Sequence, residues 1–343
     1  MTELLLESNL PIVAAPMAGG PSTVALAQAV ASAGGFPFLA GGYKSAAALA
    51  EEIGQVRGGG FDFGVNLFVP PAERADEVIV AAYAAELAQE AATHGLALEP
   101  AMLSGADVTD RWDEKLSVLL SRPVPVVSVT FGLPDPGVIT ALRQVGTRVL
   151  ATVTSTGEAQ LAADAGVDGL VVQGPAAGGH SATFDPRRTV IELATADLVR
   201  QVGSMVDLPL IAAGGVDGPT AVRELLDVGA QSVAVGTLFL RTDEAGTSST
   251  HAQALADPTR TETVVTRAFT GRPARALRNG FIDRHQDTAP TAYPEVHHLT
   301  RPLRQAASRA GDVDRLHLWA GTGWRHAPTG PAAAVIAGLT AAL

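Results

Sequence analysis

The feature that most constrains this chain is a regular alternation of short apolar segments with Ala- and Leu-rich segments, as far as Thr237. Eight of the apolar segments have the length and β-branched content of buried strands. They cover residues 12–15, 36–40, 61–67, 124–130, 148–153, 169–173, 208–213 and 232–235. Near-continuous apolar strands are typical of a parallel sheet covered on both faces. Eight such strands within about 240 residues predict an α/β fold, a closed (β/α)₈ TIM barrel, with an open doubly wound sheet as the alternative.

The segments between the strands have helical periodicity and carry helix start and stop signals. The expected barrel helices cover residues 21–33, 45–56, 74–94, 111–121, 138–145, 157–165, 195–206 and 219–227. No GxGxxG motif follows the first strand, which argues against a Rossmann dinucleotide site.

The pattern changes after Thr237. A helical segment covers residues 243–256, residues 261–310 are rich in Arg, His and Pro with weak periodicity, and a last apolar helix covers 331–343. We therefore expect three parts: a barrel over residues 1–241, a smaller, mostly helical second domain or lid over 242–318, and a C-terminal segment over 319–343 that returns to the barrel.

Composition excludes several classes of function. The formal net charge is −11 and no basic cluster is evident, which argues against a nucleic-acid partner. The chain has no cysteine, so disulfides and thiol catalysis are excluded. Its N-terminal segment lacks the basic start and the unbroken apolar run of a signal peptide or membrane span. We expect a cytoplasmic protein, monomeric or homodimeric, with no membrane contact.

One stretch at the end of the sixth strand, VVQGPAAGGHSATF, combines three kinds of chemical group. Gln173 offers a donor and an acceptor, and the glycines, including Gly178 and Gly179, let the backbone approach a ligand. His180 follows directly, and an imidazole can titrate near neutral pH. The alternative is a tight surface turn with an incidental histidine.

The other strand ends belong to the same expected site, because all strand C-termini of a TIM barrel open on one face. Gly214 and Gly215 follow the seventh strand, and Gly236 and Thr237 follow the eighth. These two loops commonly bind a phosphate through backbone amides, to which a hydroxyl can add a hydrogen bond. Alternatively, the glycines only permit close turns.

Asn66 and Gln173 are uncharged donors and acceptors that suit the edge of a neutral heterocycle such as an isoalloxazine. The alternative is that they pin loops at the barrel rim. His180 is expected to be the only histidine on this rim, with His297 and His298 among those assigned to helices or the lid. No metal site is expected, because no HxxxH-like spacing or partnered acidic cluster occurs. No GxSxG motif is present either.

A set of short motifs resembles the nitronate monooxygenase family, formerly called 2-nitropropane dioxygenases. The motifs are APMAGG (15–20), GVNLFVP (64–70), VSVTFG (127–132), ATVTS (151–155), VQGPAAGGH (172–180), IAAGG (211–215) and VGTLFL (235–240). AYPEVHHLTRPLR (292–304) and LWAGTGWR (318–325) resemble the class I branch. The resemblance extends over nearly the whole chain, and the set is specific although each piece alone is weak.

The resemblance implies an FMN-dependent (β/α)₈ barrel with a smaller helical domain over its mouth. His180 matches the family's active-site histidine, and further positions match cofactor-binding ones. The cofactor-binding residues that we expect are Met17, Asn66, Thr130, Gln173, Gly178, Gly179, Gly214, Gly215, Ala234, Val235, Gly236 and Thr237.

Four positions depart from the family pattern. Ala176 stands where the family usually has glutamate, Ser181 where it has arginine and Ala182 where it has glycine. Thr322 replaces a glutamine in the later motif. These changes bear on substrate preference, because an arginine beside the histidine could steer an anionic substrate.

The implied reaction is the oxidation of an alkyl nitronate, typically propionate 3-nitronate, by dioxygen to a carbonyl compound and nitrite. His180 has two possible roles: protonated, it would offset the nitronate charge, and neutral, it could remove the α-proton of a nitroalkane. Two other functions stay open at this point. One is an NAD(P)H-dependent flavin reductase acting on an enoyl thioester or a quinone, and the other is a flavin- or phosphate-binding protein without turnover.

Overall fold

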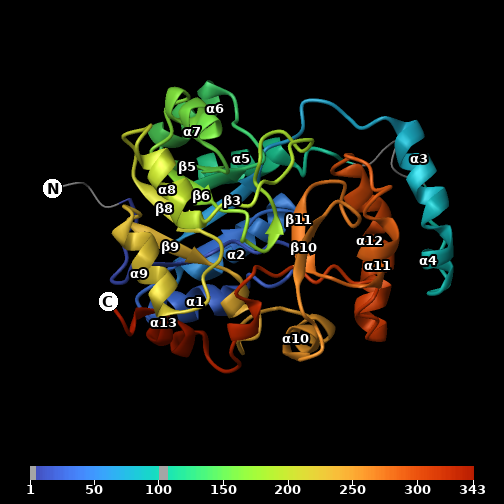
Figure 1. The fold of residues 1–343 in the computed structure, drawn as a ribbon. Helices are drawn as coiled ribbons and strands as arrows, with labels where there is room; N and C mark the ends of the chain where they lie inside the picture. The colour runs from blue at the N-terminus through green and yellow to red at the C-terminus, as the bar shows by residue number, and fades with distance from the viewer. Residues whose placement is uncertain (1–4, 100–106) are drawn as a thin grey trace.

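The computed structural model describes residues 5–99 and 107–343 and confirms the predicted (β/α)₈ barrel. Eight parallel strands close in the order β1-β2-β3-β4-β5-β6-β8-β9, and β9 pairs back onto β1 with Ile12 opposite Val233. Figure 1 shows the barrel with its helices around it. The strands are β1 (Ile12–Ala14), β2 (Phe36–Ala40), β3 (Gly64–Phe68), β4 (Val126–Thr130), β5 (Arg148–Val153), β6 (Gly169–Gln173), β8 (Leu210–Ala213) and β9 (Ser232–Val235).

Apolar residues cover both faces of these strands, which explains their near-continuous apolar sequences. The side chains of one set, including Val13, Phe38 and Ile211, form a buried cluster that Leu5 and Leu6 join. The other set packs outward against the helices in a larger cluster. Because both faces are buried, hydrophobic burial stabilises the closed sheet from inside and outside.

Most of the expected helices surround the barrel, and polar caps fix where several of them begin. The side chains of Thr23, Ser45 and Ser155 accept hydrogen bonds from backbone amides in the first turns of their helices. The barrel helices are α1 (Val24–Ser32), α2 (Ala46–Arg57), α5 (Trp112–Ser121), α6 (Pro136–Gln144), α7 (Thr156–Asp164), α8 (Thr195–Gly203), α9 (Pro219–Asp227) and the C-terminal α13 (Ala332–Thr340).

The expected single helix over residues 74–94 is wrong in its extent and continuity. The structure has α3 (Glu77–Glu86) and α4 (Ala88–Ala92) instead. The Asp76 carboxylate accepts a hydrogen bond from the Val78 amide, so the first helix begins only at Glu77. Val80 and Leu87 pack in a cluster with residues of the second domain, and Figure 1 shows both helices beside α11 and α12.

The second domain, the name kept here for residues 242–318, contains the helices α10 (Ser249–Ala256), α11 (Gly280–His285) and α12 (Glu295–Ala310). The sequence analysis missed its two strands, β10 (Thr263–Thr266) and β11 (Ala274–Leu277). The β-branched sequence TVVT of β10 favours a strand and is the signal that could have revealed it.

A third strand of this small sheet comes from the barrel. β7 (Gly179–His180) follows β6 and pairs antiparallel with β11, so that His180 lies opposite Ala274. The Ser181 amide extends the contact by donating to the Pro273 carbonyl at 2.8 Å. The loop that carries His180 is therefore held by both the barrel and the second domain.

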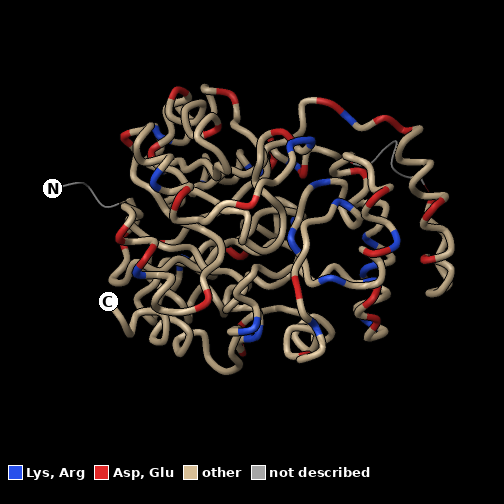
Figure 2. Tube along the Cα trace, viewed as in Figure 1, with Lys and Arg blue, Asp and Glu red and all other residues tan. Residues whose placement is uncertain are grey.

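The two parts of the chain differ in charge. The second domain has ten arginines and nine carboxylates, whereas the remaining residues have 14 basic and 26 acidic side chains, so their net charges are +1 and −12. Figure 2 shows Lys and Arg positions along the second domain. Among the described residues, no helix combines the length and apolar character needed to cross a bilayer.

Candidate active site

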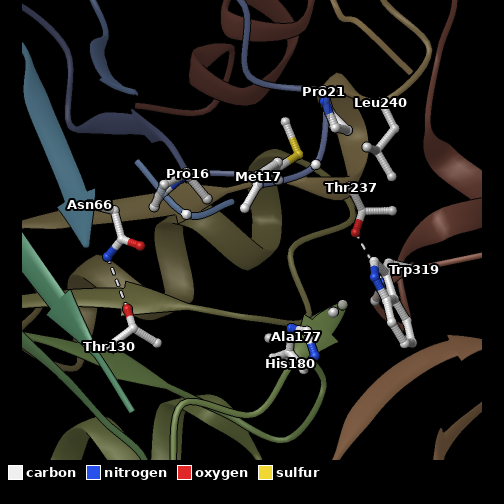
Figure 3. Close-up of a pocket in the computed structure, with 18 of the residues that line it drawn as sticks. Pro16, Met17, Pro21, Asn66, Thr130, Ala177, His180, Thr237, Leu240 and Trp319 are labelled. Carbon is white, nitrogen blue, oxygen red and sulfur yellow. Dashed lines mark hydrogen bonds between the residues drawn. The ribbon is translucent and has the colours of Figure 1, made fainter. Parts of the chain in front are cut away.

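A cavity of about 600 Å³ lies at the C-terminal ends of the barrel strands, beneath the second domain. All thirteen residues that the sequence analysis assigned to the site line it, so the fold brings every one of them together. Figure 3 shows Asn66 and Thr130 on one side, Thr237 on the other and His180 between them. The full set is Met17, Asn66, Thr130, Gln173, Gly178, Gly179, His180, Gly214, Gly215, Ala234, Val235, Gly236 and Thr237.

Asn66 on β3 is fixed by the neighbouring strand β4. Its side-chain nitrogen Nδ2 lies 2.9 Å from both Ser128 Oγ and Thr130 Oγ1 and donates to them. The residue is only 4% exposed, so these bonds hold the amide in one orientation at the cavity wall. A fixed, uncharged amide at this position suits a planar, neutral ring.

Gln173 stabilises the loop that contains His180. Its Oε1 accepts from the Ala182 amide at 2.8 Å, and its Nε2 donates to the His180 carbonyl at 3.2 Å. These are the contacts expected if the residue pins a rim loop. A direct contact between Gln173 and a cofactor stays a prediction.

The loop after β8 needs its two glycines. Gly214 and Gly215 have φ angles of 104° and 80°, in the left-handed region that glycine tolerates best. A Cβ atom on Gly214 would lie 2.8 Å from the Ala177 amide nitrogen. The bare backbone of this loop therefore faces the cavity where a barrel of this kind binds a phosphate.

The loop after β9 adds a hydroxyl to this corner. Thr237 Oγ1 accepts from the Gly321 amide at 2.9 Å, so its proton stays available for another acceptor. No Asp or Glu among the described residues lines the cavity, so no carboxylate there would repel a phosphate. Glycine amides, a free hydroxyl and no carboxylate fit the phosphate group of a flavin mononucleotide.

His180 is enclosed by aromatic rings at the cavity wall. Its ring centroid lies 5.6 Å from those of Phe131 and Tyr293 and 5.5 Å from that of Trp319. Its Nε2 lies 2.9 Å from the Thr270 hydroxyl. Burial, together with the nearby guanidinium groups of Arg272 and Arg304, lowers the pKa of His180 to about 3. His180 is therefore neutral at pH 7.

The expectation that His180 is the only histidine on this rim is wrong. His251, His297 and His317 line the same cavity, because the second domain folds over the barrel mouth. Burial lowers the pKa of His251 to about 4 and holds those of His297 and His317 well below the usual range. All four imidazoles are therefore neutral at pH 7.

The sequence analysis also missed the face of α12 that lines the cavity. The helical spacing of its members could have shown that they share one face of the helix, but not that this face meets the cavity. They are His297, Arg301, Arg304, Gln305 and Ser308.

Two aromatic residues of the cavity have unusual backbone conformations. Tyr43 and Phe131 have φ angles of 66° and 81°, which side chains other than glycine rarely adopt. The Asp110 carboxylate accepts from the Tyr43 amide at 2.9 Å and holds that residue in place. The Tyr43 hydroxyl lies 3.1 Å from that of Tyr293, a bond between barrel and second domain. Such strain is common at functional sites.

The cavity is basic although the chain is acidic. Lys44, Arg301 and Arg304 line it. Arg272 lies directly behind, with its guanidinium carbon 3.9 Å from the ring centroid of Phe131. The described residues contain no group of three or more His, Cys, Asp or Glu that could hold a metal ion. The arrangement thus suits an anionic organic ligand.

Comparison with known proteins identifies the family. The sequence profile of nitronate monooxygenase matches residues 3–342. Probable nitronate monooxygenases of Staphylococcus aureus strains MSSA476 and MRSA252 are 32% identical over 342 residues, which is 98% of this chain and 94% of each relative. The chain belongs to the nitronate monooxygenase family.

Solved structures agree with this placement. A nitroalkane oxidase from Streptomyces ansochromogenes superposes with a TM-score of 0.92 at 45% identity, covering 97% of this chain and 95% of that one. FabK from Thermotoga maritima is more distant, with a TM-score of 0.74 and 25% identity over 98% of this chain and 93% of its own. The chain is thus an oxidoreductase of a family whose members are typically flavoproteins.

Ser181 stands where nitronate monooxygenases usually have an arginine, but a cation lies beside it. The Arg272 Nε donates to the Ser181 carbonyl at 3.4 Å, and its Nη2 donates to the carbonyl of Thr183. Burial lowers the pKa of Arg272 to about 10, so it is charged at pH 7. A cation from the second domain therefore lies beside position 181, although Ser181 itself carries no charge.

Proposed function

We propose that this protein is an FMN-dependent nitronate monooxygenase that oxidises alkyl nitronates, such as propionate 3-nitronate, with dioxygen to a carbonyl compound and nitrite. One observation carries the proposal: the thirteen residues predicted from strand ends and family motifs line one basic cavity in an acidic chain of this family.

The chain's own groups would hold the cofactor from two sides. The glycine loops after β8 and β9 would bind its phosphate, and Asn66, Thr130 and Met17 would lie along its ring system. When bound, FMN would supply the electron transfer between the organic substrate and dioxygen. The protein's contribution is position, charge and exclusion of water.

Of the two roles considered for His180, its environment favours the neutral one. A neutral imidazole can accept the α-proton of a nitroalkane, whereas a cation cannot. The Thr270 hydroxyl, 2.9 Å from Nε2, would orient the ring for that transfer. The charge of a nitronate would instead be offset by guanidinium groups, of which Arg272 and Arg304 are buried at or behind the cavity wall.

The test is an absorption spectrum of the purified protein, followed by nitrite release after addition of propionate 3-nitronate. We expect an oxidised flavin spectrum, FMN rather than FAD on extraction, and nitrite formed with consumption of dioxygen. A yellow protein that forms no nitrite but is bleached quickly by NADH without oxygen would contradict the proposal in favour of a reductase. A colourless protein that does not take up FMN would contradict both.

A further inference from the structure

Arg304 is a buried guanidinium in the wall of the cavity. It lies on α12, is 5% exposed and has four hydrogen-bond contacts. Its Nε donates to Thr300 Oγ1 at 3.0 Å and its Nη1 to His317 Nε2 at 3.3 Å. Its Nη2 donates to the His297 carbonyl at 2.8 Å and to His297 Nδ1 at 3.2 Å. Every one of these partners is uncharged.

A buried cation is costly unless a counter-ion accompanies it. Burial lowers the pKa of Arg304 to about 10, so the group stays charged at pH 7. The half-buried Arg315 shows the usual solution elsewhere in the molecule, with Glu90 at 2.7 Å and Asp312 at 2.9 Å. The described residues offer Arg304 no such carboxylate, and its open side is the cavity.

The contacts of Arg304 also fix the protons on its neighbours. Arginine only donates, so His317 Nε2 and His297 Nδ1 must be acceptors without protons. Their protons therefore lie on His317 Nδ1 and His297 Nε2. His317 Nδ1 is buried and has no partner among the described residues. A guanidinium has five N–H groups, so four contacts leave one of them unused as well.

We propose that Arg304 is a specificity-determining residue, which binds a planar two-oxygen anion of the substrate with support from His317. This rests on the proposed function and deepens it, because the anion is either the nitronate itself or a carboxylate elsewhere on the same substrate. A guanidinium matches two coplanar oxygens better than an ammonium does. Arg301 lines the same cavity but is exposed, so water screens its charge.

The first experiment measures binding to the flavin-loaded full-length protein by the change in flavin absorbance. The probes are propionate and propionamide, which have nearly the same shape and differ in charge. We expect wild type to bind propionate at least about tenfold more tightly, and Arg304→Met to lose that preference, in line with the typical energy of a charged hydrogen bond. Arg315→Met, which removes a guanidinium outside the cavity lining, serves as the control and should keep it.

If Arg304→Met does not fold, Arg304→Lys is the alternative variant, because it keeps the positive charge. It should retain the flavin and show a smaller preference for propionate than wild type does. Equal affinity of wild type for propionate and propionamide would overturn the inference without any variant. Loss of the preference in Arg301→Gln together with its full retention in Arg304→Lys would overturn it as well.

A second experiment separates the two sources of the anion. The kcat/KM of Arg304→Lys is compared on propionate 3-nitronate and on 1-propyl nitronate, which has no carboxylate. A loss on the first substrate alone assigns the carboxylate to Arg304, and a loss on both assigns the nitronate; a loss on neither overturns the inference. Wild type that prefers propionate but forms no nitrite from either substrate would contradict the proposed function and leave the anion site standing.

Discussion

The two halves of the cavity wall present different chemical groups. The barrel half consists mainly of backbone amides, glycines and uncharged side chains at strand ends. The second-domain half presents imidazoles and guanidinium groups. Strand ends of a closed barrel fall at fixed positions, so backbone groups there are ready-made ligands. The guanidinium groups of Arg301 and Arg304 come instead from α12, which lies over the opening.

This difference suggests that the two halves have separate functions. Changes in the barrel half should affect retention of the cofactor, and changes in the second-domain half should affect substrate binding and turnover. His180 belongs to both halves, because it follows β6 and pairs with β11. The predictions below test this separation, beginning with the largest expected effect.

His180→Asn should lose most turnover and keep the flavin. A well-placed general base typically contributes about 10²- to 10⁴-fold in rate, and asparagine cannot accept the proton. The measurement is nitrite release from a neutral nitroalkane, together with the ratio of flavin to protein absorbance. Thr270→Val is the matched variant, since it removes the hydroxyl 2.9 Å from Nε2 but keeps the imidazole. Unchanged turnover in His180→Asn would refute the assignment.

Gly214→Ala should lower the fraction of protein that retains flavin. It should have a smaller effect on turnover per flavin-containing molecule. A methyl group there meets the Ala177 amide at 2.8 Å in a left-handed backbone, which costs on the order of 1–3 kcal/mol. Gly218→Ala is the control in the same loop, because that residue is extended at φ 174° and has open space. The measurement is the flavin content of both variants after gel filtration. Equal loss in both variants would contradict the assigned role of the loop.

Acid should destabilise the protein partly through its buried histidines. The pKa of His251 is about 4 in the folded protein, below the ordinary value of about 6.5 expected in the unfolded chain. Between these values the unfolded chain binds a proton that the folded one does not, so stability falls as pH falls. The slope is about 1.4 kcal/mol per pH unit for one such group.

His251→Gln measures that contribution. Glutamine can replace the donor to the Trp319 carbonyl, 3.0 Å from His251 Nε2, but it does not titrate. The unfolding free energy of the variant, measured by urea unfolding between pH 4.5 and 6, should depend less steeply on pH than that of wild type. The difference should correspond to about one proton. Identical slopes would mean that His251 carries its proton in the folded state.

Tyr43→Phe should have the smallest effect. It removes the hydrogen bond to the Tyr293 hydroxyl at 3.1 Å, worth about 0.5–1.5 kcal/mol of unfolding free energy. A double-mutant cycle with Tyr293→Phe isolates that pair. Additive effects of the two substitutions would show that the hydroxyls do not couple the barrel to the second domain.

Much of the site could be predicted from the sequence because its barrel half depends on local signals. Apolar runs that carry Asn66 or Gln173 near their ends, or that are followed by Gly214 or Gly236, mark strands and their C-termini. The barrel topology gathers those ends on one face. The family motifs supplied the assignment of His180 as the active-site residue. These steps need no knowledge of distant contacts.

The second-domain half could not be predicted in this way. His297 and Arg304 share a helix, but nothing local tells which surface that helix will face. Pairing of β7 with β11 joins residues more than 90 positions apart, and such long-range pairing has no signature within either segment.

The sequence by itself determined the barrel, the two glycine loops after β8 and β9 and the imidazole at the end of β6. Only the tertiary structure decided that this imidazole is neutral and that the guanidinium groups of Arg304 and Arg272 line or back the cavity. The reason is physical: strand ends follow from local patterns, whereas burial and charge at a site are set by whatever the rest of the chain packs around it.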